Sequence, residues 1–157
     1  MGLSKKLLAV IAVLAIGGLG AGAAWSQDAM KVVQDRQALM KQQGKDLGAI
    51  RAYGTGKGDL AAAEAAVADL TQTTRKIPTL FPPGSGMAEF PGKSAAKPTI
   101  WAEQDKFLAA QKNTVAKADA LVATVKSGGP AAAAAGASDL WDHGCQGCHD
   151  TFRETKS

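Results

Sequence analysis

The chain has 157 residues, and its 18 basic residues against 14 acidic ones give a formal net charge of +4. This length fits one domain. The sequence has no basic stripe interleaved with aromatic residues, so we expect no nucleic-acid partner.

The first 26 residues have the pattern of a signal peptide. Lys5 and Lys6 precede an uncharged apolar run over Leu7 to Leu19, and Ala24 and Ser26 are small residues at the positions that a signal peptidase reads. We predict a leader over 1–26, a domain over 27–157 and export to the periplasm. The alternative is an uncleaved anchor, because the run is nearly long enough to span a membrane. Cleavage would leave no integral membrane span, and 16 basic residues against 14 acidic ones.

Two helices are predicted next. From about Asp28 to Ala52, one face carries Val33, Met40, Gly44 and Leu47 at helical spacing, with Arg36 near its edge. Three glycines within 54–58 end this helix. Asp59 can cap a second helix, which ends at Pro78. Its stripe recurs at steps of three and four residues: Leu60, Ala63, Val67, Leu70, Thr74 and Ile77.

Residues 78–98 contain five prolines and read as a long crossover loop that buries Phe81 and Phe90 against the helices. A third helix is predicted from Thr99 to Ser127, and a fourth from about Ala131 to Glu154. Two rows at seven-residue spacing predict the buried seam of the third helix: Trp101, Leu108, Val115, Val122, and Gln104, Gln111, Ala118, Val125. The fold class is therefore all-α, an antiparallel four-helix bundle with a long crossover loop between helices 2 and 3.

The fourth helix ends in Cys145-Gln146-Gly147-Cys148-His149, a spacing typical of covalent haem attachment. Residues three and four apart share one side of a helix. Cys145 and Cys148 can therefore each add a thiol across one of the two vinyl groups of a haem. His149 can then serve as the proximal axial ligand of the iron. We predict one c-type haem.

Three other readings of the motif stay open. A dithiol redox site expects a βαβ context, which the helical flanks do not offer. A zinc site needs a fourth ligand, and His143, two residues before Cys145, is the one further histidine. A disulfide between cysteines so close on one helix would be strained.

With the motif placed on the last helix, the whole chain after the leader resembles the class II c-type cytochromes, the family of cytochrome c′ and its six-coordinate, low-spin relatives. Four stretches carry the resemblance: 145–153, Arg36-Gln37-Ala38-Leu39-Met40, Phe81-Pro82-Pro83-Gly84 and Lys97-Pro98-Thr99-Ile100-Trp101. The resemblance implies that Arg36 lies near a haem propionate and Arg153 beside the proximal imidazole. Without it, both arginines fit a solvated helix face.

The resemblance also implies that Met40 faces the distal side of the iron. A thioether ligand there gives a six-coordinate iron suited to one-electron transfer. A methionine on an apolar stripe can also be simple core packing. Met30, Met87 and His143 are weaker candidates for the sixth ligand.

Two functions follow from these alternatives. We expect a periplasmic electron carrier that exchanges electrons with redox partner proteins. The alternative is a five-coordinate protein that binds NO or CO behind an apolar wall of Val33, Met40, Leu47 and Phe81. We expect no enzyme, because the distal stripe offers no acid and base pair. The resemblance also implies a homodimer through the first two helices, in which Ala61, Ala65 and Ala68 would allow close helix contact. The alternative is that these alanines are neutral surface.

Overall fold

The computed structural model describes residues 20–155, with side chains from Asp28 onward. The predicted leader lies mostly outside the described residues, and the predicted cut after Ser26 lies within the range of the first helix. None of the helices in the described range is long and apolar enough to cross a membrane.

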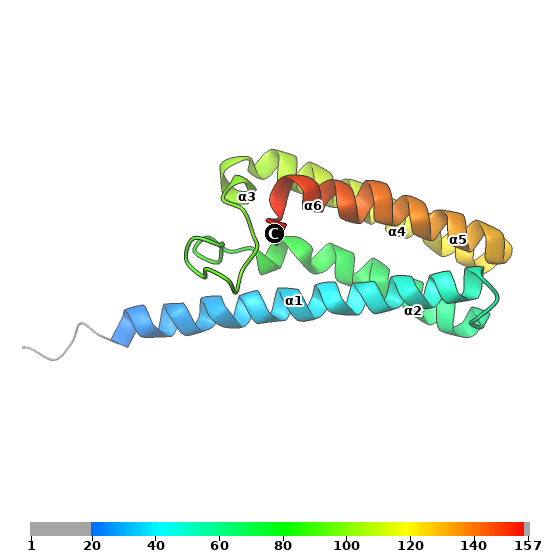
Figure 1. Cartoon of the computed structure of the whole chain (residues 1–157), viewed down its shortest axis with the longest axis horizontal. Helices are drawn as coiled ribbons and strands as arrows, with labels where there is room; N and C mark the ends of the chain where they lie inside the picture. Colours follow the sequence, from blue (N-terminus) through cyan, green and yellow to red (C-terminus); the bar gives the residue numbers. More distant parts are fainter. Residues whose placement is uncertain (1–19, 156–157) are drawn as a thin grey trace, which may run out of the picture.

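Four helical rods form the predicted bundle (Figure 1). The first two are α1, Gly20–Gly54, and α2, Leu60–Lys76. The third is α4, Gln104–Ser127, and the fourth is continuous through α5, Gly129–Asp139, the π-helical turn η2, Leu140–Gln146, and α6, Gly147–Phe152. α1 packs on α2, α2 on α4, α4 on α5, and α5 on α1, which closes the bundle.

The start of α2 is fixed by local chemistry, as predicted. The Asp59 side chain accepts a hydrogen bond from the backbone N–H of Ala62 at 2.8 Å. Such a cap pairs one of the N–H groups that the first turn of a helix leaves free. The stripe of α2 is buried as predicted, except that Leu60 remains 39% exposed.

The predicted third helix is interrupted. A short 3₁₀ helix, η1, Ile77–Leu80, opens the crossover loop, and α3, Thr99–Ala102, closes it before the backbone turns at Glu103. The Trp101 indole N–H donates to the Phe81 carbonyl at 3.0 Å, which ties α3 to the start of the loop. The long α4 therefore begins at Gln104, five residues later than predicted.

Of the two predicted rows of the α4 seam, one is buried after its first residue and the other lies at the edge of the core. Gln111, Ala118 and Val125 are buried, but Gln104 is exposed and the row from Trp101 to Val122 is only half-buried. The inner partner row is Phe107, Thr114 and Leu121. On α1, likewise, Gly44 is exposed and Arg36, at the edge of the predicted stripe, is buried.

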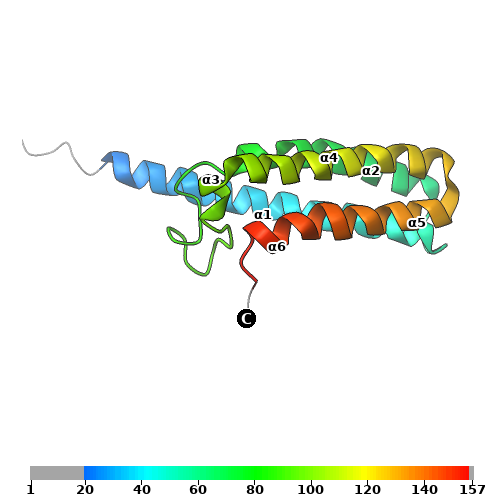
Figure 2. The same cartoon turned by 90° about the horizontal axis from the view of Figure 1, so that it is seen from above.

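Two buried clusters share the interior. The first lies among α1, α2, α4 and α5, and includes Leu47, Ile50, Leu70, Leu121 and Leu140. The second lies near the loop and the C-terminus and includes Ile77, Ile100, Phe107 and Phe152. Both views show α3, the loop and α6 gathered at one end of the bundle (Figures 1 and 2).

Candidate functional site

The cysteine motif spans the junction of η2 and α6. A π-helical turn carries one more residue per hydrogen-bonded ring than an α-helix. Two side chains of α4 contact its backbone carbonyls. The Asn113 amide donates to the His143 carbonyl at 2.8 Å, and the Thr114 hydroxyl lies 3.2 Å from the Gly144 carbonyl. The fourth rod is thus anchored on α4 directly before Cys145.

Gly144 permits this close approach. A Cβ at this position would lie 2.9 Å from Leu140 Cδ1 and 3.5 Å from the Cα of Thr114. Nothing in the sequence marks Asn113 and Thr114 as contacts of the motif, because their partners lie 30 residues away. Their spacing on α4 could be recognised only once η2 was placed beside them.

Both cysteines are free thiols and half-buried. Cys145 packs against the first cluster and Cys148 against the second. Burial raises the pKa of the Cys145 thiol, and it raises that of Cys148 to about 11, with a smaller contribution from Cys145. Two neutral thiols therefore stand three residues apart at the boundary of the two clusters.

His149 follows them with a ring nitrogen that has no partner. Its Nδ1 is buried and makes no hydrogen bond among the described residues. Burial lowers the pKa of the imidazole, the Arg153 charge lowers it further, and Asp150 opposes both. The ring is thus neutral near pH 7, the form in which imidazole binds a metal. Because buried polar atoms are rarely left unpaired, this nitrogen fits a site that receives another group.

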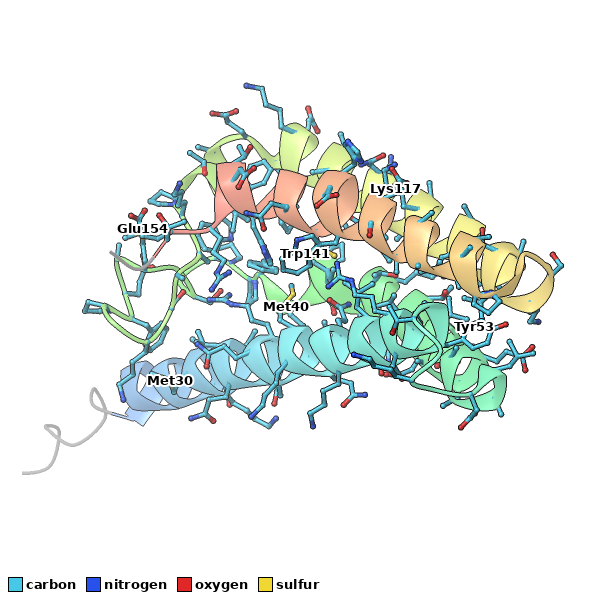
Figure 3. All side chains as sticks on the ribbon, turned by 45° about the vertical axis from the view of Figure 1, so that its right-hand side comes forward. Met30, Met40, Tyr53, Lys117, Trp141 and Glu154 are labelled. Atoms are coloured by element: carbon cyan, nitrogen blue, oxygen red, sulfur yellow. The ribbon has the colours of Figure 1, made fainter. Side chains whose placement is uncertain are left out.

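Met40 approaches the motif from the opposite helix. Its side chain is half-buried and packs against the second cluster, as Cys148 does. Figure 3 shows it pointing from α1 toward the last rod, while Trp141 points from that rod toward α1. The Arg51 guanidinium lies over the Trp141 ring, 5.5 Å from its centroid.

Gly44 lies between Met40 and Arg51 on this side of α1. A Cβ there would meet no atom within 4 Å. The same is true of Gly147, between the two cysteines. The site combines two thiols, a neutral imidazole and a thioether with open glycine positions on facing helices. This donor set and this space fit a covalently attached haem.

Arg36 is buried rather than solvated, with 5% of its surface exposed. Its guanidinium donates to the crossover loop and stacks on Phe81, with its central carbon 4.7 Å from the ring centroid. Burial lowers the pKa of the guanidinium below its ordinary value. The loop partners, Ser85 and Ser94, carried no signal in the sequence.

Arg153 is exposed, and its backbone forms an antiparallel bridge with Ala96 of the loop. The weaker candidates for an iron ligand lie elsewhere. Met30 is ten residues before Met40 on α1, about 15 Å along the axis. Met87 lies in the loop, with its N–H bound to the Ala96 carbonyl at 2.9 Å. His143 is exposed, and its Nδ1 lies 2.9 Å from an Asp139 carboxylate oxygen.

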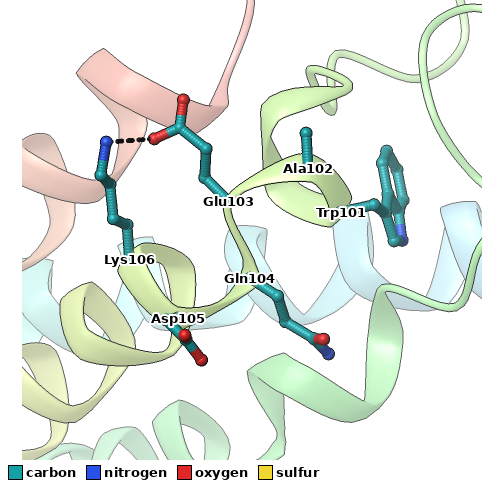
Figure 4. A pocket seen from close by; sticks show the side chains of 6 residues that line it. All are labelled: Trp101, Ala102, Glu103, Gln104, Asp105 and Lys106. Carbon is teal, nitrogen blue, oxygen red and sulfur yellow. Dashed lines mark ion pairs between the residues drawn. The ribbon is translucent and has the colours of Figure 1, made fainter.

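A surface hollow at the break between α3 and α4 contains none of these residues. It is lined by the consecutive residues 101–106, and Lys106 and Glu103 form an ion pair of 2.6 Å at its edge (Figure 4). The described residues also contain no group of three or more His, Cys, Asp or Glu side chains that could hold a metal ion. The zinc alternative therefore finds no support in this part of the chain.

Comparisons with known proteins agree with these observations. Residues 31–153 match the family described as Cytochrome C′. Cytochrome c-556 of Agrobacterium fabrum is 34% identical over 153 residues, covering 96% of this chain and 98% of the relative. Cytochrome c′ of Rhodopseudomonas palustris is 34% identical over 155 residues, covering 98% and 99%.

Solved structures are similar as well. Cytochrome c′ from Rhodobacter spheriodes matches with a TM-score of 0.73 at 30% identity, covering 82% of this chain and 98% of that one. An NMR-validated structure of oxidized R. palustris cytochrome c556 matches with a TM-score of 0.69 at 28% identity, covering 80% and 98%.

Proposed function

Because the chain belongs to the cytochrome c′ family, we propose that it is a periplasmic one-electron carrier with His149 and Met40 as the two axial ligands. The family binds one c-type haem and consists of electron carriers and gas-binding proteins. When bound, the haem supplies an iron that accepts and gives up one electron. Redox partner proteins would supply and remove that electron.

Cys145 and Cys148 would hold the haem through two thioether bonds, each formed by adding S–H across a vinyl group. His149 would bind the iron through its neutral imidazole. The unpartnered, buried Nδ1 supports this role. Arg153, whose charge acts on the imidazole, would lie beside the proximal ligand.

The observation that carries the proposal is that Met40 and Cys148 pack against the same buried cluster from opposite helices. A Met40 thioether would hold the haem iron together with His149 and would leave no position open to other ligands. One-electron exchange would then need little rearrangement. Of the other described methionines, Met30 and Met87 do not pack against this cluster.

Replacing Met40 tests this proposal. In the reduced holoprotein, Met40→Ala should convert a low-spin visible spectrum into a high-spin one, because the sixth ligand is lost. Leu39→Ala is the matched control, since Leu39 is a half-buried neighbour in the same cluster. A wild-type spectrum that is already high-spin, or one that Met40→Ala leaves low-spin, contradicts Met40 ligation.

The second candidate function is a five-coordinate protein that binds NO or CO. The apolar surroundings of Met40 favour it, since Leu39, Phe81 and Leu108 pack against the same cluster. An apolar wall admits small neutral diatomic molecules and offers water no hydrogen-bond partner. Rapid carbon monoxide binding to the reduced wild-type protein would support this candidate over the first.

The proposal also includes export of the protein and its assembly into a homodimer. We infer a leader over 1–26 from the basic start, the apolar run and the small residues before Gln27. N-terminal sequencing of the protein purified from the periplasm should begin at Gln27. A homodimer would use α1 and α2, where Ala61, Ala65 and Ala68 are exposed.

A further inference from the structure

Arg36 is the hub of a hydrogen-bond cluster that joins α1 to the crossover loop. One terminal nitrogen donates to the Leu80 carbonyl at 3.3 Å and to the Ser85 hydroxyl at 3.1 Å. The other donates to the Ser85 carbonyl and to the Ser94 hydroxyl, both at 2.6 Å. All four terminal N–H groups are therefore directed at the loop.

Further hydrogen bonds within the loop surround this contact. Ser94 accepts from Arg36, its hydroxyl lies 3.1 Å from the Ser85 carbonyl, and it accepts from the Ala96 N–H at 3.2 Å. A hydroxyl has one donor and two acceptor sites, so this set uses all of them. Ser85, with none of its surface exposed, and Ser94, at 7%, have no bulk water to replace these partners.

The crossover loop also forms backbone hydrogen bonds with the residues that follow the haem motif. The Lys97 N–H donates to the Phe152 carbonyl at 3.0 Å, and the Glu154 N–H donates to the Ala95 carbonyl at 2.8 Å. These bonds attach the loop to the strand-like end of the chain directly after α6. His149 lies only three residues before Phe152.

A row of aromatic rings runs alongside this backbone connection. Phe81 stacks on the Arg36 guanidinium. Its ring lies 5.1 Å from that of Phe107, which lies 5.4 Å from that of Phe152, both edge to face. Phe81 also packs against the cluster that Met40 contacts. Arg36 thus contacts a ring that packs against the same cluster as Met40.

We propose that Arg36 is a positioning residue that holds the crossover loop and Phe81 in place, and that this contact limits access of ligands to the distal face. The inference rests on the proposed haem site for its functional consequence. It differs from a propionate contact, since only the Nε–H of the guanidinium is left for another acceptor.

The test removes hydrogen bonds between Arg36 and the crossover loop. Ser94→Ala removes an acceptor of Arg36 without changing the charge of the protein. Arg36→Lys keeps the charge but cannot reach Ser85 and Ser94 with two nitrogens. Gln37→Ala is the control, because Gln37 donates to the Lys93 carbonyl of the same loop at 2.6 Å from an exposed position.

Two measurements on the full holoprotein separate the outcomes. Amide hydrogen exchange of residues 81–96 should be about tenfold faster in Ser94→Ala and Arg36→Lys, as the loss of a hydrogen bond to a charged group predicts. Carbon monoxide association with the reduced protein, measured in a Met40→Ala background, should also be faster in both. Gln37→Ala should change neither.

The proposal is overturned if the loop of Ser94→Ala exchanges as the wild-type loop does and if Ser94→Ala, added to Met40→Ala, binds carbon monoxide no faster than Met40→Ala alone. It is also overturned if Arg36→Lys changes neither rate and shifts only the reduction potential, which is the signature of a propionate contact. The Met40→Ala background removes the Met40 thioether from every carbon monoxide measurement. The result therefore does not depend on whether Met40 is a ligand, which the spectrum of the parent protein decides separately.

Discussion

Asp46 should make the protein less stable at neutral pH than an uncharged residue would. It lies in α1 with 6% of its surface exposed, and Gln42 donates to its Oδ1 at 2.8 Å. The Oδ2 is buried and has no partner among the described residues. The pKa of Asp46 is raised from 3.8 to about 6, chiefly by burial and also by Asp69 of α2, while Gln42 and Lys45 oppose the rise.

Proton linkage gives the direction in which pH changes the free energy of unfolding. Between pH 3.8 and about pH 6 the folded protein binds more protons at Asp46 than the unfolded chain. The free energy of unfolding therefore falls as pH rises through this window and stays low above it. The full rise in pKa corresponds to at most about 3 kcal/mol, at 1.36 kcal/mol per pKa unit.

Asp46→Asn removes the charge and keeps the shape. Asn can still accept from Gln42, and its amide can donate toward Asp69. Urea unfolding of the holoprotein should show a gain of about 2–3 kcal/mol at pH 7.5, which falls to about 1 kcal/mol at pH 4.5.

Asp35→Asn is the matched control. Asp35 is exposed and pairs with Lys31 at 2.6 Å, so its loss should cost only a few tenths of a kcal/mol at either pH. If Asp46→Asn is no more stable than the wild type at pH 7.5, or if its gain is the same at both pH values, the linkage argument is wrong.

Two further predictions concern glycines. Gly54→Ala should destabilise the protein by about 1–3 kcal/mol in urea unfolding, because its Cβ would lie 2.7 Å from Ala134 Cβ and 2.9 Å from the Ala134 backbone N. Gly48→Ala should instead raise the free energy of unfolding by about 0.5–1 kcal/mol, because a Cβ at this position would meet no atom within 4 Å. Equal effects of the two substitutions would refute the close packing of α1 on α5. Gly44→Leu should lower the haem content per chain, measured by pyridine haemochrome, because its side chain would enter the space between Met40 and Arg51. Gly48→Leu should keep full haem content, and a normal content in both variants would place the haem elsewhere.

The features that sequence predicted well are local. The Asp59 cap depends on residues three apart, and the turn at Gly128 and Gly129 depends on backbone freedom, with Gly129 at a φ of 74°. Pro130 lies in the first turn of α5, where a proline removes no helical hydrogen bond. The cysteine spacing is local as well, so the motif could be read before any helix was placed.

The seam of α4 shows where periodicity stops being informative. Rows that begin at Trp101 and at Phe107 both repeat every seven residues, so the sequence alone allows either to face inward. Burial of the Phe107 row depends on its contacts with Phe81 and Phe152, which come from distant parts of the chain. The break at Glu103 has the same origin, since the Trp101 indole is held by the Phe81 carbonyl.

Arg36 could not be placed from sequence either. A charged residue beside an apolar stripe most often faces water, and nothing in a loop rich in proline and glycine marks Ser85 and Ser94 as its partners. The π-helical turn that carries Cys145 likewise contacts Asn113 and Thr114 of α4. These are long-range contacts, which only the folded chain brings together.

We propose that Met40 is the sixth ligand of the iron. The most direct test is a carbon monoxide titration of the reduced wild-type protein, followed by its visible spectrum. We predict a low-spin spectrum that changes slowly and incompletely, because the thioether must leave before carbon monoxide can bind. A high-spin spectrum that converts at once to the carbon monoxide adduct would contradict Met40 ligation and identify the protein as a gas-binding member of its family.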